Sequence, residues 1–104
     1  MGTWCLMLSP RLRRLPVAIV RSHEVRVARG AWARTLGLSH LDRDEAGTGL
    51  LIPGCAAVHT FGMRFSLDLV FLDADLRPLS RRRAVAPRRF AWDRGASAVL
   101  ELPC

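Results

Sequence analysis

Apolar and polar residues alternate along several short stretches of the chain, and this alternation predicts half-buried β-strands. In residues 23–29, Val25 and Val27 occupy one face, whereas Glu24 and Arg26 occupy the other. Because successive strand residues point to opposite sides of a sheet, this segment is expected to bury one face and expose the other. Further short strands are expected at residues 50–52, 58–65, 76–85 and 98–102, with a loop over residues 87–95.

Residues 67–72 show a different pattern, because both of their faces are largely apolar. Leu67, Leu69 and Phe71 share one face, and Asp68 lies on the other face among apolar residues. Strands that are buried on both faces lie inside a sheet. The segment is therefore predicted to be a central strand that carries one carboxylate.

One short helix is expected after the first core strand. Residues 31–41 place Trp32, Leu36 and Leu41 at roughly helical spacing, and Gly37 interrupts the pattern. Several short strands with at most one helix predict a mainly β, small α+β fold class. We expect a compact β sandwich or a barrel-like domain.

The chain of 104 residues is long enough for one domain. Its N-terminal part is basic and contains Pro10 and Pro16, so we expect a poorly ordered lead-in over residues 1–22. Residues 23–104 are expected to form a single β-rich domain. Half of the residues are hydrophobic, which excludes intrinsic disorder for the chain as a whole.

No apolar run approaches the roughly 20 residues that a membrane helix needs, so we expect no membrane span. The apolar N-terminal stretch precedes its arginines, which reverses the order found in a secretory signal. A cytoplasmic location is therefore expected. Three cysteines and three histidines lack the spacing of metal ligands or of a disulfide framework, so we expect no metal and no cofactor.

All 16 basic residues are arginines, and against 9 acidic residues they give a formal net charge of +7. The codon usage of a GC-rich bacterial genome also favours Arg over Lys, so this bias need not reflect selection for a partner. The charge itself favours weak attraction to nucleic acid or to anionic surfaces.

Asp68 is the first candidate for function, because a carboxylate among apolar strand residues is costly to bury without a partner. Arg64 and His59 lie upstream and could fold back to it, with Thr60 beside them. The leading interpretation is a non-catalytic ligand-binding or accessory module with a polar pocket around these residues, for an unknown small molecule or protein partner. The alternatives are a structural ion pair that sets strand register, and a small hydrolase-like enzyme that uses His59, Arg64 and Asp68.

Arginines interleaved with aromatic residues form a second candidate site. Such residues hold single-stranded nucleic acid through phosphate contacts and base stacking. A solvated basic surface explains the same pattern, and the chain has no familiar RNA- or DNA-binding signature. The residues concerned are Arg81, Arg82, Arg83, Arg88, Arg89 and Trp92, with Phe90 nearby.

The segment VHTFGMRFSLDLVFLD at residues 58–73 resembles the family called domain of unknown function 192, and within it the actinobacterial-type branch. Three other segments agree in order and spacing: RTLGL at 34–38, GLLI at 49–52 and VLEL at 99–102. The resemblance implies a compact β-rich domain and assigns no site residues. Family members usually continue past VLEL with a further strand. From its apparent absence we expect an open sheet edge, marginal stability and self-association through that edge.

Overall fold

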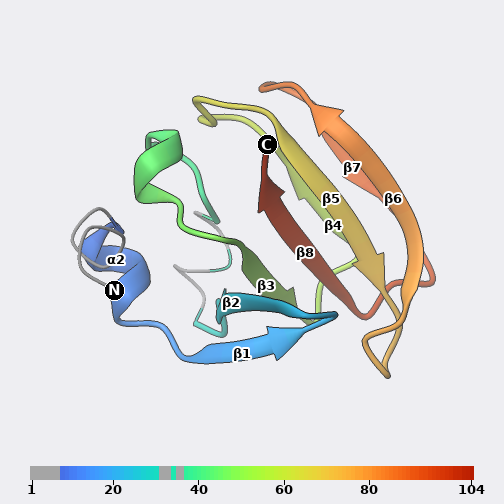
Figure 1. The fold of residues 1–104 in the computed structure, drawn as a ribbon. Coiled ribbons are helices and arrows are strands. Elements are labelled where there is room, and N and C mark those ends of the chain that lie inside the picture. The colour runs from blue at the N-terminus through green and yellow to red at the C-terminus, as the bar shows by residue number, and fades with distance from the viewer. Residues whose placement is uncertain (1–7, 31–33, 35–36) are drawn as a thin grey trace.

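Six strands form one mixed sheet and two more form a small sheet in a computed structural model that describes residues 8–30, 34 and 37–104 (Figure 1). In sheet order the six are β1 (Val17–Val20), β2 (His23–Val27), β3 (Leu50–Pro53), β8 (Ala98–Pro103), β5 (Leu67–Leu72) and β6 (Pro78–Val85). β2 and β3 run parallel, and every other neighbouring pair is antiparallel. The small sheet pairs β4 (Ala57–His59) with β7 (Phe90–Trp92). The predicted mainly β class is confirmed.

The last strand, β8, lies at the centre of the large sheet between β3 and β5. Val99 is paired with Ile52 of β3 on one side and with Phe71 of β5 on the other. Because side chains alternate along a strand, Glu101 shares a face with Val99. That face is turned toward a hydrophobic core, which places a carboxyl group on a buried surface.

Both faces of the large sheet are buried at its central strands, β3, β8 and β5. One face contributes to the first core cluster, which also takes residues from the N-terminal segment, from the connection between β2 and β3, and from the small sheet. Its members are Leu12, Ala28, Leu38, Leu41, Ala46, Leu50, Ile52, Met63, Leu67, Leu69, Phe71, Ala91 and Val99. The opposite face forms the second core cluster of Val20, Val25, Val27, Leu51, Val70, Leu72, Ala98 and Leu100. Burial on both faces explains the nearly continuous apolar run of β5.

The described part of the N-terminal stretch belongs to the fold, which differs from the poorly ordered lead-in expected over residues 1–22. Helix α2 (Pro10–Arg13) buries Leu12, and β1 pairs with β2 along its whole length. The turn between these two strands has positive φ angles of 53° at Arg21 and 70° at Ser22. Such hairpin turns are usually marked by Asn-Gly or Asp-Gly, so this pair carries no hairpin signal in the sequence. Residues 1–7 lie outside the described residues.

The strand expected over residues 58–65 is wrong beyond His59, where β4 ends. The next residues form a turn in which the Met63 N–H donates to the Thr60 carbonyl at 3.2 Å. Gly62 has a φ of 81°, which glycine adopts without the steric cost that a side chain would add. The chain therefore leaves the small sheet here and returns as β5.

β7 lies within residues 87–95, which were expected to form a loop. Its two aromatic residues are exposed and only Ala91 between them is buried. The burial pattern is thus the reverse of what the apolar character of the residues predicts. Pairing with β4, which is distant in sequence, makes this segment a strand.

The helix expected over residues 31–41 falls largely on residues 31–33 and 35–36, which lie outside the described residues. The Arg34 N–H donates to the Gly30 carbonyl at 2.9 Å, which is the spacing of an α-helical hydrogen bond. Residues 37–40 form turns, and a short 3-10 helix, η1 (Arg43–Glu45), follows them. In the described parts of the chain, no helix is long and apolar enough to cross a membrane.

The outer strands of the large sheet are β1 and β6, whereas β8 is paired on both sides. β6 carries Pro78 and three consecutive arginines, Arg81, Arg82 and Arg83. Proline and repeated like charges both oppose pairing between the edges of two copies. Self-association through an open edge stays a prediction, and this arrangement makes β6 a poor edge for it.

Candidate functional site

Asp68 lies on β5 and is held by the neighbouring chain segments. Its Oδ1 accepts a hydrogen bond from the Ala84 N–H at 2.8 Å and another from the Cys104 Sγ at 3.3 Å. The Ala84 hydrogen bond contributes most to lowering the pKa of Asp68, although partial burial opposes it; Cys104, Arg81 and Arg83 lower it further. The β5–β6 register shifts at this point, so the carboxylate binds an amide at an irregular part of the ladder. This geometry favours the structural role for Asp68.

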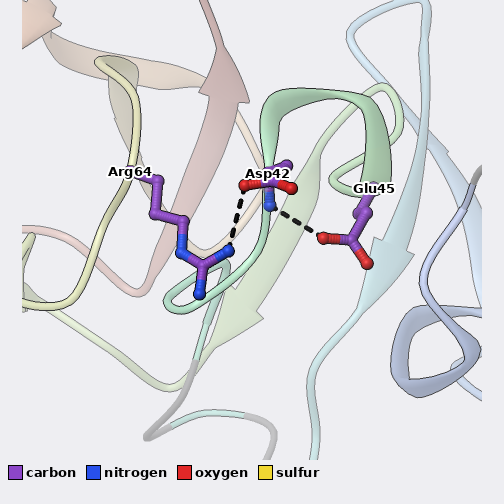
Figure 2. A network of polar contacts seen from close by, with 3 residues as sticks. All are labelled: Asp42, Glu45 and Arg64. Carbon is purple, nitrogen blue, oxygen red and sulfur yellow. Dashed lines mark hydrogen bonds and ion pairs between the residues drawn. The ribbon is translucent and has the colours of Figure 1, made fainter.

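Arg64 lies in the loop after β4 and forms an ion pair with Asp42, with 3.0 Å between Nη1 and Oδ1 (Figure 2). The Asp42 N–H donates to Glu45 Oε1 at 3.0 Å, so the three residues form one surface network around η1. The Arg64 and Asp42 side chains are 55% and 67% exposed. Exposed ion pairs of this kind contribute at most about 1 kcal/mol to the free energy of unfolding. The network therefore orders a surface turn and adds little to the stability of the fold.

Thr60 follows β4 and is almost completely buried, at 1% exposure. Its hydroxyl donates to the Ala86 carbonyl at 2.7 Å and accepts from the Arg89 N–H at 2.8 Å. Its main chain also donates to the Arg89 carbonyl and accepts from the Arg88 N–H, at 2.8 and 3.2 Å. Thr60 therefore fastens the loop before β7, and both roles of its hydroxyl are used.

His59 is the last residue of β4 and is exposed. Its ring lies 5.8 Å from the ring of Phe61 and 6.4 Å from that of Phe90, measured between centroids. In the part of the chain that the structure describes, no hydrogen bond or ion pair joins Asp68 to Arg64 or to His59. The four candidate residues thus stand in separate surroundings.

A different carboxyl group, that of Glu101, faces a pocket under the small sheet. We call this hollow the Glu101 pocket; its volume is about 250 Å³. Most of its wall is apolar, and Arg34 and Glu101 line it together with the Cys55 thiol. The lining residues are Arg34, Gly37, Leu38, Ile52, Cys55, Ala57, Val58, His59, Met63 and Glu101.

Glu101 is 3% exposed, and burial raises its pKa to about 7, against 4.5 for an ordinary glutamate. A hydrogen bond from the main chain of Leu38 opposes this shift and holds part of the carboxyl group. The other oxygen, Oε1, is buried and has no hydrogen-bond partner among the residues that the structure describes. Buried polar atoms are nearly always paired, so this oxygen calls for an explanation.

The chain segment at Gly37 packs closely against Glu101 Oε1. Gly37 has a φ of 52°, and a Cβ atom on it would lie 3.0 Å from Glu101 Oε1. Arg11 of α2 holds this segment from outside, because its Nη2 donates to the carbonyls of Gly37 and Ser39, both at 2.9 Å. The N-terminal helix therefore supports one wall of the Glu101 pocket.

Two further residues that line the Glu101 pocket, Arg34 and Cys55, have hydrogen-bond partners within the protein. Arg34 Nη2 donates to the Gly54 carbonyl at 2.8 Å, and the Cys55 thiol donates to the Ala57 carbonyl at 2.9 Å. Arg34 retains other N–H groups for a ligand, since a guanidinium has five. Within the described ranges, no group of three or more His, Cys, Asp or Glu side chains is placed to hold a metal ion.

The family model for DUF192, described as "Uncharacterized ACR", matches residues 16–104. The chain belongs to the DUF192 family. No curated protein matches it significantly. Within DUF192, the four segments that carried the sequence resemblance all reach the Glu101 pocket: Arg34 and Gly37 from the first, Ile52 from the second, His59 from the third and Glu101 from the fourth.

Two solved structures share the fold of this DUF192 domain. A protein of unknown function from Novosphingobium aromaticivorans DSM 12444 is 22% identical, with a TM-score of 0.67 over 92% of this chain and 79% of that one. A protein from Sinorhizobium meliloti 1021, described as a "putative transcription regulator", is 20% identical, with a TM-score of 0.65 over 85% of this chain and 78% of that one. At these identities the likeness concerns the fold alone.

Sequence reasoning missed Glu101 as a site residue. The segment VLEL reads as an ordinary alternating strand with one polar position, and such a position is usually exposed. A signal was present, because Glu101 has the same strand parity as Val99. Sharing a face with Val99 indicates that Glu101 is buried only once Val99 is known to belong to a core cluster.

Proposed function

We propose that this DUF192 domain is a binding module for a small molecule that presents a hydrogen-bond donor to Glu101. The observation that carries the proposal is the Glu101 carboxyl group, which lines a pocket and whose Oε1 is buried without a hydrogen-bond partner in the described part of the chain. A buried polar group left unsatisfied costs roughly 1–3 kcal/mol. A bound donor would recover this cost, which gives the domain an intrinsic preference for an occupied pocket.

The walls of the Glu101 pocket support a ligand with a small apolar body. Its volume of about 250 Å³ lies just below the roughly 300–1,000 Å³ of typical small-molecule sites. Ile52, Val58 and Met63 supply apolar wall surface, and Glu101 supplies an acceptor. A primary ammonium group is the natural match, because it carries three donors and the charge opposite to a carboxylate.

Arg34 extends this chemistry to the other end of the ligand. Its guanidinium lines the same pocket and is suited to a carboxylate. A molecule that carries an amine at one end and a carboxylate at the other would satisfy both Glu101 and Arg34. Small aliphatic amino acids have these two groups and an apolar body of suitable size.

Three related compounds separate these contributions: isobutylamine, isovalerate and valine. We expect valine to move the amide signals of Gly37 and Leu38 in two-dimensional NMR spectra most, isobutylamine less and isovalerate least. At about pH 8, where Glu101 is ionised, Glu101→Gln should abolish the response to both amines, because a neutral amide no longer attracts the ammonium group. Asp68→Asn is the matched control and should respond as the unmodified protein does. Equal responses in Glu101→Gln and the unmodified protein, or none with any compound, would reject the proposal.

The pocket expected around Asp68 has less support. The Asp68 Oδ1 already accepts two hydrogen bonds, whereas Glu101 Oε1 accepts none from the described residues. The hydrolase-like alternative needs His59, Arg64 and Asp68 to meet, and Arg64 is instead paired with Asp42. A binding module therefore remains the better reading, with Glu101 rather than Asp68 at its centre.

A further inference from the structure

Exposed aromatic side chains gather on the outer face of the small sheet. β4 and β7 are antiparallel, with His59 opposite Phe90 and Ala57 opposite Trp92, so these side chains share one face. Phe90 is 68% exposed and Trp92 is 60% exposed, while Ala91 between them is buried. Phe61 adds a further ring, 5.2 Å from that of Phe90 between centroids. Large apolar groups that are exposed together mark a contact surface.

A groove lies beside these rings, and its lining residues come from the edge strand β6, from β7 and from the loop between the two strands. Its volume is about 600 Å³, and its basic residues are Arg82 of β6 and Arg89 of the loop between β6 and β7. Phe90 and Trp92 form its aromatic side. The groove thus joins two positive charges to two exposed rings, and we call it the β6–β7 groove.

Strand alternation divides the three consecutive arginines between two faces. Arg82 is opposite Leu69, and its Cζ lies 5.7 Å from the ring centroid of Phe71, on the side of the groove. Arg81 is opposite Val70 on the other face. The arginine run is therefore not one patch, and Arg82 alone of the three lines the β6–β7 groove.

The loop that carries Arg89 is preorganised by hydrogen bonds to Thr60. Hydrogen bonds that Thr60 donates and accepts through its hydroxyl and its main chain hold the backbone from Ala86 to Arg89, and Arg88 takes a positive φ of 66° there. Asp93 follows Trp92 in the chain, and its oxygens accept hydrogen bonds from the Ser80 hydroxyl and the Gly95 N–H. Its charge offsets part of the charge of Arg82, and Arg88 and Arg89 have no such neighbour in the described contacts.

We propose that the β6–β7 groove and the aromatic face beside it bind single-stranded nucleic acid. Phe90 and Trp92 stand at alternate positions of one strand, roughly 7 Å apart along it, which allows each ring to stack on its own base. Arg82 and Arg89 lie where the phosphates of such a strand would pass. A duplex would keep its bases stacked away from these rings, so the surface selects single strands.

Phe90 and Trp92 belong to a paired strand and not to a projecting loop of the kind that inserts into a membrane. The arginine-bearing edge also disfavours a second copy of the chain. Both occupants remain outcomes of the test. The proposal is independent of the Glu101 pocket, so either can fail without the other.

The test is fluorescence anisotropy with a labelled oligo(dT) of about 12 nucleotides, within the site size of a small module. We expect Trp92→Ala to weaken binding roughly 5- to 150-fold, the range for loss of one base–aromatic stack. Arg89→Ala should reduce the slope of log affinity against log salt by about 0.7, the value for one phosphate contact of a single strand. Circular dichroism melts establish that each variant is folded.

Arg81→Ala and Arg82→Ala form the matched pair, because they remove the same charge from opposite faces of one strand. Arg82→Ala should weaken binding clearly more than Arg81→Ala. Equal losses for this pair together with no effect of Trp92→Ala would show attraction to net charge only and would overturn the proposal. So would Trp92-dependent binding to anionic phosphatidylserine vesicles without oligonucleotide binding, or a Trp92-dependent dimer in sedimentation.

Discussion

Glu101 should make the folded domain lose stability as the solution becomes less acidic. An unfolded glutamate titrates near 4.5, whereas burial raises the pKa of Glu101 in the folded domain to about 7. Between these values the folded state holds a proton that the unfolded state has released. The free energy of unfolding therefore falls as pH rises through this window; the contribution is fully present below about 4.5 and lost above about 7.

The size of the effect follows from the two pKa values. They differ by about two and a half units, and each unit corresponds to about 1.4 kcal/mol. Glu101 should thus lower the free energy of unfolding by about 3 kcal/mol between pH 4.5 and pH 7. Asp68 and Asp93 have lowered pKa values, so they titrate below this window and do not mask the effect.

Glu101→Gln isolates this contribution, because glutamine is close in shape to protonated glutamate and stays neutral at every pH. Without ligand, its free energy of unfolding should match that of the unmodified protein near about pH 4 and exceed it by about 3 kcal/mol near about pH 8. Urea denaturation followed by circular dichroism at several pH values measures this. Glu24→Gln, at an exposed position of β2, is the control for loss of one carboxylate. A constant difference between Glu101→Gln and the unmodified protein across pH would refute the reasoning.

Three other substitutions test the surroundings of the site by urea denaturation. Gly37→Ala should destabilise the domain by about 1–3 kcal/mol, because it adds a Cβ at positive φ and at 3.0 Å from Glu101 Oε1; an unchanged midpoint would contradict the fit described for this wall. Thr60→Val should cost about 1–3 kcal/mol, because the Ala86 carbonyl and the Arg89 N–H lose their partner; a smaller loss would mean that water replaces the hydroxyl. Arg64→Ala should change stability by at most about 1 kcal/mol, and a larger loss would show that its exposed pair with Asp42 has a structural role.

The sequence predicted best those strands whose own hydrophobic pattern matches the way they are buried. β5 begins and ends at the predicted residues, 67 and 72, because both of its faces are covered and only Asp68 interrupts its apolar run. β4 and β7 were misjudged for the opposite reason. Each is only three residues long and depends on pairing with the other, which no local pattern records.

The candidate site shows the same limit for two carboxylates. Asp68 and Glu101 both occur in strands among apolar residues, and the sequence drew attention to Asp68 because its strand is the more apolar. In the structure Asp68 reaches the irregular edge near Ala84, whereas Glu101 lies on the inner face of a central strand. Which of the two is buried depends on sheet order, and sheet order is set by contacts between distant segments.

The sequence by itself determined the mainly β class, the family, the net charge and the parity of residues along each strand. The period of two places Arg81 and Arg82 on opposite sides, and likewise separates Glu101 from Leu100. Only the tertiary structure decided which side is covered. Parity is a local property of the backbone, whereas burial requires a partner surface, and for Glu101 that surface comes from residues 37 and 38, brought over β8 by the long connection between β2 and β3.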